Sequence, residues 1–144
     1  MPATDFTFYN AAKEALGEGG IDFSTATLRM KLCDSTSNAE TLSVADFASI
    51  TGEIAATGGY TAGGLLLSGV TWGAGSSPEQ MRLDANDVSI EATGGDITDV
   101  MYAVIGIPGG PALCFSQLND TEFTVTEGNT LAVQFSADGI ATLD

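Results

Sequence analysis

Apolar and polar residues alternate in short runs along most of the chain after residue 64. Alternation with a period of two places every second side chain on the same face, which is typical of half-buried β-strands. Glycine, proline, serine and asparagine separate these runs, as expected of turns between strands. The pattern predicts strands at residues 65–72, 80–84, 87–92, 97–107, 112–118, 122–126, 130–136 and 139–143. The run 97–107 is the most continuously apolar, so we expect it at the centre of a sheet.

The first third of the chain predicts one helix and one strand. Apolar residues recur at helical spacing from Phe8 to Leu16, with an Asp/Thr cap candidate ahead of them and "GEGG" behind, so a short helix is expected at about 7–16. Residues 25–33 ("TATLRMKLC") alternate strictly and form the clearest half-buried strand. Its polar face carries Arg29 and Lys31.

Residues 34–64 predict a long excursion from the sheets. One helical turn is expected around 43–49, and "TGEIAATGGYTAGG" predicts a glycine-rich loop with a single aromatic residue, Tyr60. Loops of this length inside a domain are usually functional or disordered.

Together these elements predict an all-β protein with a single domain over residues 1–144. A length of 144 residues fits one domain, and 18 glycines suit a chain with many turns. Short strands with frequent turns indicate an antiparallel β-sandwich, either jelly-roll or immunoglobulin-like, with a short N-terminal helix.

Charge narrows the classes of partner. Four lysines and arginines oppose nineteen acidic residues, which gives a net charge of −15. Nucleic acid and anionic membranes are therefore not expected as partners, because both are bound through basic side chains. Solubility alone would account for the charge, and so would a partner with a basic surface.

The residues available for chemistry are few. Without any histidine the chain lacks the commonest general base and metal ligand, so we expect neither an enzyme nor a cofactor or metal site. Cys33 and Cys114 each lie in an apolar run, which favours buried thiols over a disulfide. The N-terminus has no basic region and no apolar stretch approaches about 18 residues, so neither a signal peptide nor a membrane anchor is expected.

Two binding sites remain open. "LDANDVSI" (83–90) resembles the DxND element of cadherin repeats, in which such residues bind calcium. Calcium takes six to eight oxygens from several segments, and the other cadherin motifs are missing, so a turn at Asp84–Asp87 is favoured. Trp72 and Tyr60 are candidates for stacking on a sugar, although isolated aromatic residues usually belong to a core or its rim.

Four segments in order along the chain resemble a family of small phage structural proteins: "GGYTAGGLLLSGVTW", "LDANDVSI", "ITDVMYAVI" and "FSADGIATL". That family has a GYxxGG loop before a strand, then an LDADDV-type segment, an "AVIY"-type strand and a final strand with GI. The leading "FTFYNAAKEALGEGGIDFSTATLRMKL" resembles the helix and strand with which the family begins. Two tryptophans common in the family are absent, since Ser89 and Ile90 follow "LDANDV" and Phe135 precedes the final GI.

The resemblance implies a virion component of the head decoration, or cement, type. Such a protein is made in the host cytoplasm, binds the major capsid protein on the capsid exterior and stabilises the head by bridging capsid subunits. We expect it to be a homo-dimer or homo-trimer that matches a capsid symmetry axis. A tail, baseplate or receptor-binding component is the alternative, followed by a calcium- or carbohydrate-binding adhesive module.

Candidate docking residues lie in the irregular parts of the chain, because aromatic and aliphatic anchors dominate interfaces. The candidates are Phe6 and Phe8 near the N-terminus, within "PATDFTF", and Phe47, Ile50, Ile54 and Tyr60 in the long excursion. Local core packing is the alternative for each. If the excursion is a docking arm, deleting residues 36–58 leaves a folded β-domain that no longer binds capsids.

Overall fold

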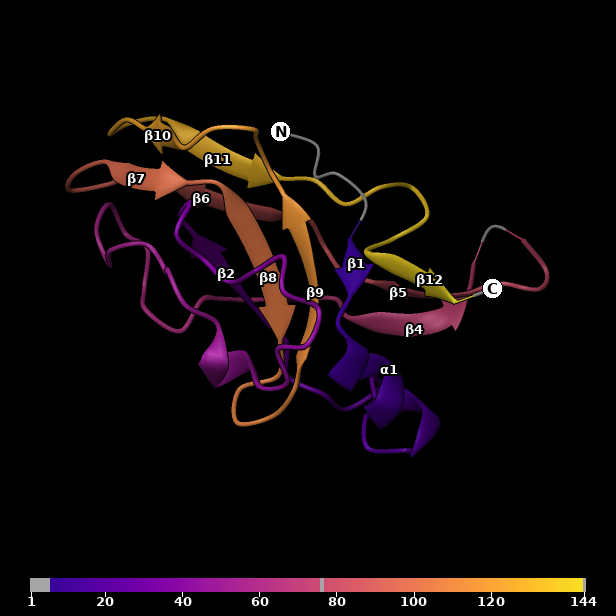
Figure 1. The fold of residues 1–144 in the computed structure, drawn as a ribbon. Coiled ribbons are helices and arrows are strands. Elements are labelled where there is room, and N and C mark those ends of the chain that lie inside the picture. The colour runs from indigo at the N-terminus through magenta and orange to yellow at the C-terminus, as the bar shows by residue number, and fades with distance from the viewer. Residues whose placement is uncertain (1–5, 76, 144) are drawn as a thin grey trace.

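The computed structural model, which describes residues 6–75 and 77–143, consists mostly of strands in antiparallel sheets (Figure 1). The predicted all-β sandwich with one short helix is confirmed. The two layers are built from strands that bend and continue from one short sheet into the next.

The first layer has strand order β1-β9-β8-β2-β3. Its central strand, β8, is buried along its whole length, as predicted for the run 97–107. That run bends at Met101, after Asp99 takes a left-handed conformation with φ of 62°, and its first part, β7, pairs with β10. The bounds of these strands are β1 Thr7–Phe8, β2 Arg29–Cys33, β3 Leu65–Leu66, β7 Ile97–Val100, β8 Tyr102–Gly106, β9 Ala112–Gln117 and β10 Phe123–Val125.

The second layer has strand order β12-β5-β4, and β6 continues from β5 to pair with β11. The bounds of these strands are β4 Thr71–Ala74, β5 Met81–Asp84, β6 Val88–Glu91, β11 Thr130–Val133 and β12 Ala141–Leu143. Apolar side chains of both layers meet in one main core, which includes Met30, Leu32, Ile105 and Leu113 from the first layer and Leu83, Val88, Leu131 and Val133 from the second.

The run 65–72, predicted as one strand, crosses from one layer to the other. β3 pairs with β2 in the first layer and β4 pairs with β5 in the second. Between them the Leu67 N–H donates to Leu28 O (2.9 Å) and Ser68 O accepts the N–H of Asn86 (2.9 Å). A single strand was the wrong prediction here because the apolar pattern continues through the crossing.

Residues 34–50 form a third layer over the outer face of the first sheet, where Figure 1 shows this purple-to-magenta segment running across β2 and β8. Their buried side chains build a second core with the outer face of β2, β8 and β9. The 3₁₀ helix η1 (Phe47–Ser49) lies within the predicted helical turn 43–49. Members of this second core include Tyr9, Cys33, Ala39, Val44, Phe47, Ile50, Tyr102, Val104 and Ala112.

This cover makes β2 buried on both faces, so the half-buried strand predicted at 25–33 is wrong in that respect and in its length. Lys31 lies under the cover, donates to Phe47 O (3.0 Å) and places its Nζ 4.5 Å from the centre of the Phe47 ring. That ring packs against Gly106, where a Cβ atom would meet it. The absence of a side chain at Gly106 therefore lets the third layer close onto the sheet.

The helix α1 (Asn10–Gly17) begins three residues later than the predicted start at residue 7. Thr7 and Phe8 pair with β9 as a short edge strand, and Tyr9 takes the N-cap position in an extended conformation. Tyr9 makes no side-chain cap hydrogen bond, so the predicted cap is not formed by Thr7, while Asp5 lies outside the described residues. The buried face of α1 is small and centres on Ala12.

Candidate functional site

An apolar groove of about 740 Å³ lies between α1, the loop that follows it and the end of the second layer. The helix contributes Leu16, the loop contributes Ile21 and Phe23, β1 contributes Phe8, β4 contributes Trp72, and β12 contributes Leu143. Glycine ends the helix at the point where the chain must turn toward the sheet: Gly19 has φ of 75° and Gly20 N donates to Ala15 O. This turn brings Ile21 and Phe23 opposite Trp72.

The floor of the groove is stiffened by an aromatic pair. The rings of Phe23 and Trp72 lie 5.1 Å apart between their centres and are tilted by 40°. Phe23 is buried, whereas Trp72 is half-buried. Tilted aromatic pairs at this distance are favourable beyond the area they bury, so the indole is held in place at the groove surface.

Beside the groove, the core-facing side of the second sheet extends beyond the part that the rest of the protein covers. Leu83 on β5 is fully buried, and Met81 lies on the same face two residues earlier. Leu143 and Ala74 are in register with Met81, so the three side chains form the next row of that face. Met81 is 39% exposed and Leu143 is 55% exposed. An apolar row continuous with the core is thus left open to solvent where β12 meets the groove.

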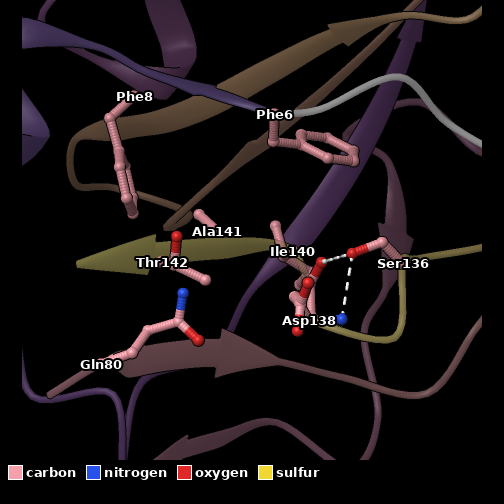
Figure 2. A pocket seen from close by; sticks show the side chains of 9 residues that line it. Phe6, Phe8, Gln80, Ser136, Asp138, Ile140, Ala141 and Thr142 are labelled. Carbon is pink, nitrogen blue, oxygen red and sulfur yellow. Dashed lines mark hydrogen bonds between the residues drawn. The ribbon is translucent and has the colours of Figure 1, made fainter. Parts of the chain in front are cut away.

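A second cavity of about 280 Å³ adjoins the groove at Phe8 and Thr142, which line both. Figure 2 shows Phe6 and Phe8 on one side of β12 and Gln80 on the other, with the Phe8 ring pointing toward β12. Phe6 also packs against Phe135, with ring centres 5.7 Å apart. Ser136 Oγ donates to Gly139 O (3.2 Å) and accepts from the Asp138 N–H (3.1 Å). These polar groups close a turn within the chain.

Of the six predicted docking residues, the structure brings only Phe6 and Phe8 to this site. The other four, Phe47, Ile50, Ile54 and Tyr60, are 3–6% exposed and belong to the two cores. As exposed anchors they were predicted wrongly, because the excursion packs back onto the sheet and uses its apolar side chains there. A folded domain after deletion of residues 36–58 is no longer expected for the same reason.

Tyr60 is held by a hydrogen-bond network inside the protein. Its hydroxyl donates to Glu53 Oε1 (2.7 Å) and accepts the Leu32 N–H (3.1 Å) at the end of β2. The same Glu53 oxygen accepts the Gly63 N–H (2.8 Å), which ties the glycine-rich loop together. Burial, together with the neighbouring Glu53, raises the pKa of Tyr60. A sugar platform made of Trp72 and Tyr60 is therefore not formed, since the Tyr60 ring is enclosed.

The "LDANDVSI" segment does not gather its oxygens at one point. Asp84 Oδ1 accepts the Ala85 N–H (2.8 Å), Asp87 Oδ1 accepts the Phe135 N–H (2.9 Å), and Asn86 Nδ2 donates to Ser68 Oγ (3.2 Å). Each side chain thus serves a different neighbour. The predicted turn at Asp84–Asp87 is also wrong, because residues 85–87 only connect β5 to β6, which pair with β12 and β11 respectively. Within residues 6–75 and 77–143, no cluster of three acidic, cysteine or histidine side chains suited to a metal ion is found.

Both cysteines are free and buried, as predicted. Burial raises the pKa of the Cys33 thiol to about 12 and raises that of Cys114 as well. A thiol that stays protonated is a poor nucleophile, so neither is poised for covalent chemistry.

Three of the four basic side chains are used inside the protein. Arg29 donates to Gly64 O (3.0 Å), Arg82 to Ala137 O (2.9 Å) and Lys31 to Phe47 O. Lys13 is exposed and lines the apolar groove opposite Asp22. Hydrogen bonds from Ser24 lower the pKa of Asp22, so this carboxylate remains ionised at the groove rim. Nineteen acidic residues against four basic ones leave the chain with a net charge of −15.

Comparison of the chain with protein families, curated proteins and solved structures found no match. Across the part of the chain that the structure describes, no helix has the length and apolar character needed to cross a bilayer.

Sequence reasoning missed most of the groove. Leu16, Ile21, Phe23 and Leu143 looked like ordinary apolar positions of a helix, a loop and a strand. Trp72 was singled out, and its place at the rim of the core fits the expectation for an isolated aromatic residue. The apolar residues of the strand that ends in Leu143 were the other available sign of this site. Such residues must pack against another part of the protein or a partner, and the sequence does not show which.

Proposed function

We propose that this protein is a structural component of a phage virion, which decorates the outside of the assembled head and stabilises it by bridging capsid subunits. The observation that carries the proposal is the apolar groove with its open row Met81–Leu143. Continuous apolar surface beside a concavity is typical of protein–protein contact sites. Two titratable side chains line the groove, the cation Lys13 and the anion Asp22. A lining with so few titratable groups fits a protein-binding surface better than a catalytic site.

The virion assignment itself rests on the order of the sequence segments that resemble phage structural proteins. Those segments correspond to the loop with β3 and β4, then β5 with β6, then β7 with β8 and, after β9 to β11, the final strand β12. A chance likeness of single motifs would not be expected to reproduce the family's order along the chain. Each motif alone is short, so their order along the chain is the main support.

The mechanism is additive binding. Packaged DNA pushes outward on a thin shell, and a subunit that contacts two capsid proteins contributes binding free energy that rupture must overcome. A specific interface of roughly 1,600 Å² of total buried area is enough for stable attachment. A dimer or trimer that engages several capsid subunits at once gains avidity without a new kind of contact. We propose such a homo-oligomer here.

Copy number tests the proposal most directly. Densitometry of purified virions should give a copy number comparable to that of the major capsid protein, and the protein should co-sediment with isolated heads. A handful of copies, found with tails after heads and tails are separated, would instead assign it to the tail or baseplate. Thermal shift in calcium or with glycans addresses the adhesive alternative, and a decorating protein should give no shift.

A further inference from the structure

We propose that the groove binds a short segment of a partner protein in which apolar side chains are flanked by lysine or arginine. The proposed function would make that partner a capsid subunit, and the inference rests on it for the partner's identity only. The chemistry of the segment follows from the groove and from the charge around it.

The apolar side chains of the segment are inferred from the apolar side chains of the groove that are exposed to solvent. Trp72 is half-buried in the row of Leu83, which is itself fully buried, and Leu143 in the outer row beside Met81 is 55% exposed. Covering these side chains removes apolar surface from water at about 25 cal/mol per Å². The groove of about 740 Å³ has room for several side chains of a partner.

The basic part of the segment follows from charge complementarity. Within the described chain, Lys13 is the one basic side chain for which no hydrogen bond to a backbone carbonyl is found. Around it, Asp22 lines the groove, and Glu14 and Glu18 are exposed on and just after α1. In a chain of net charge −15, this setting attracts a cationic partner and speeds its encounter.

The same charges argue against a second copy of the chain in the groove. Two molecules of net charge −15 that faced each other there would bring like-charged rims together. A homo-oligomer would accordingly form through another face, with its grooves left free for the partner.

Matched synthetic peptides test the inference without any virion. One peptide combines leucine with lysine, a second has glutamate in place of lysine, and a third has alanine in place of leucine. Titrated into the ¹⁵N-labelled protein, the leucine–lysine peptide should shift amide resonances gathered around Leu16, Trp72 and Leu143. The glutamate peptide should not bind, and the alanine peptide should bind more weakly.

Two matched variants give the control. Leu143 and Leu66 are exposed leucines on short edge strands, 55% and 59% exposed, and threonine preserves strand propensity at either position. Leu143→Thr should weaken binding of the leucine–lysine peptide about tenfold, as truncation of an interface anchor does, whereas Leu66→Thr should not. Lys13→Glu should strengthen binding, and added salt should weaken it.

Several outcomes would overturn the inference. Amide shifts spread over the whole acidic surface, or equal binding by Leu143→Thr and wild type, would mean that the peptide acts only as a polycation. Sedimentation that finds wild type dimeric and Leu143→Thr monomeric would place a second copy in the groove. Head binding separates this inference from the proposed function. If the protein binds the peptide but not heads, the groove assignment stands and the virion role is wrong. If the Leu143→Thr variant binds heads as well as wild type does, the virion role stands and the groove assignment is wrong.

Discussion

The Tyr60 hydroxyl joins the glycine-rich loop to β2, because it donates to Glu53 Oε1 within the loop and accepts the N–H of Leu32. Tyr60→Phe removes the hydroxyl and leaves the buried Leu32 N–H without its acceptor. A buried donor left unsatisfied costs about 1–3 kcal/mol, so the free energy of unfolding should fall by that amount in urea titrations.

Tyr102→Phe is the control for this prediction. The Tyr102 hydroxyl donates to Glu40 at the protein surface (3.1 Å), where water can replace it. Because Glu40 is exposed, loss of this hydroxyl leaves no buried partner unsatisfied, and it should cost less than about 1 kcal/mol although the Tyr102 ring is buried. Equal losses for the two variants would contradict the role assigned to Tyr60.

Buried thiol and tyrosine hydroxyl groups predict that the free energy of unfolding falls at alkaline pH. Burial raises the pKa of Cys33 from 9.0 to about 12, and it raises those of Cys114, Tyr9 and Tyr60. The unfolded chain loses the thiol protons above pH 9.0 and the tyrosine protons above pH 10.0, while the folded chain keeps them, so unfolding becomes easier as pH rises. The contribution of Cys33 is complete below pH 9.0 and is lost progressively up to about pH 12.

Urea unfolding at a series of alkaline pH values measures this effect. Each such group steepens the decline by at most about 1.4 kcal/mol per pH unit. Cys33→Ala should make the decline shallower by about one group's share. An identical slope for the variant and wild type would show that Cys33 keeps an ordinary pKa.

Among the elements, the segment 34–50 differs most from its expected role, since it covers β2, β8 and β9 instead of extending outward. Deletion of residues 36–58 removes Ala39, Val44, Phe47, Ile50 and Ile54 from the cores. We now expect a chain without cooperative unfolding and with collapsed amide dispersion in NMR spectra.

Point variants in the same segment avoid a large deletion. Phe47→Ala should cost about 3–5 kcal/mol, because a large buried side chain leaves a cavity between Gly106 and Lys31. Leu42→Ala, at an exposed leucine of the same segment, should cost less than about 1 kcal/mol. A folded deletion protein, or equal costs for the two variants, would restore the segment as a separable arm.

The sequence located nearly every strand, because alternation records which side chains share a face. Prediction from sequence failed where the structure of a segment depends on pairing with a strand that is distant in sequence. Pairing with β9 turns Thr7 and Phe8 into a strand within the predicted helix, and the layer crossing interrupts the run 65–72. Phe8 was predicted for the site, but the exposure of Leu143 was not, because alternation does not reveal where the opposite layer ends.

For the whole molecule, four basic residues against nineteen acidic ones leave a net charge of −15. Self-repulsion should therefore weaken the folded state at low salt. Added sodium chloride should raise the unfolding temperature by several degrees, equivalent to about 1 kcal/mol, as screening shortens the reach of these charges.

Lys13→Glu should lower the unfolding temperature at low salt, and the difference from wild type should shrink as salt is added. Calorimetry at low and high ionic strength measures both effects. Unfolding temperatures that do not respond to salt would mean that the acids lie too far apart to repel one another.

The crossing between β3 and β4 also constrains how the molecule opens. Residues 65–74 contribute a strand to each layer, and between those strands they exchange hydrogen bonds with Leu28 and Asn86. Neither layer can peel away without breaking this shared stretch. Amide protons of β2 and β5 should therefore exchange with solvent deuterium in a single cooperative event, so that the sandwich behaves as one foldon.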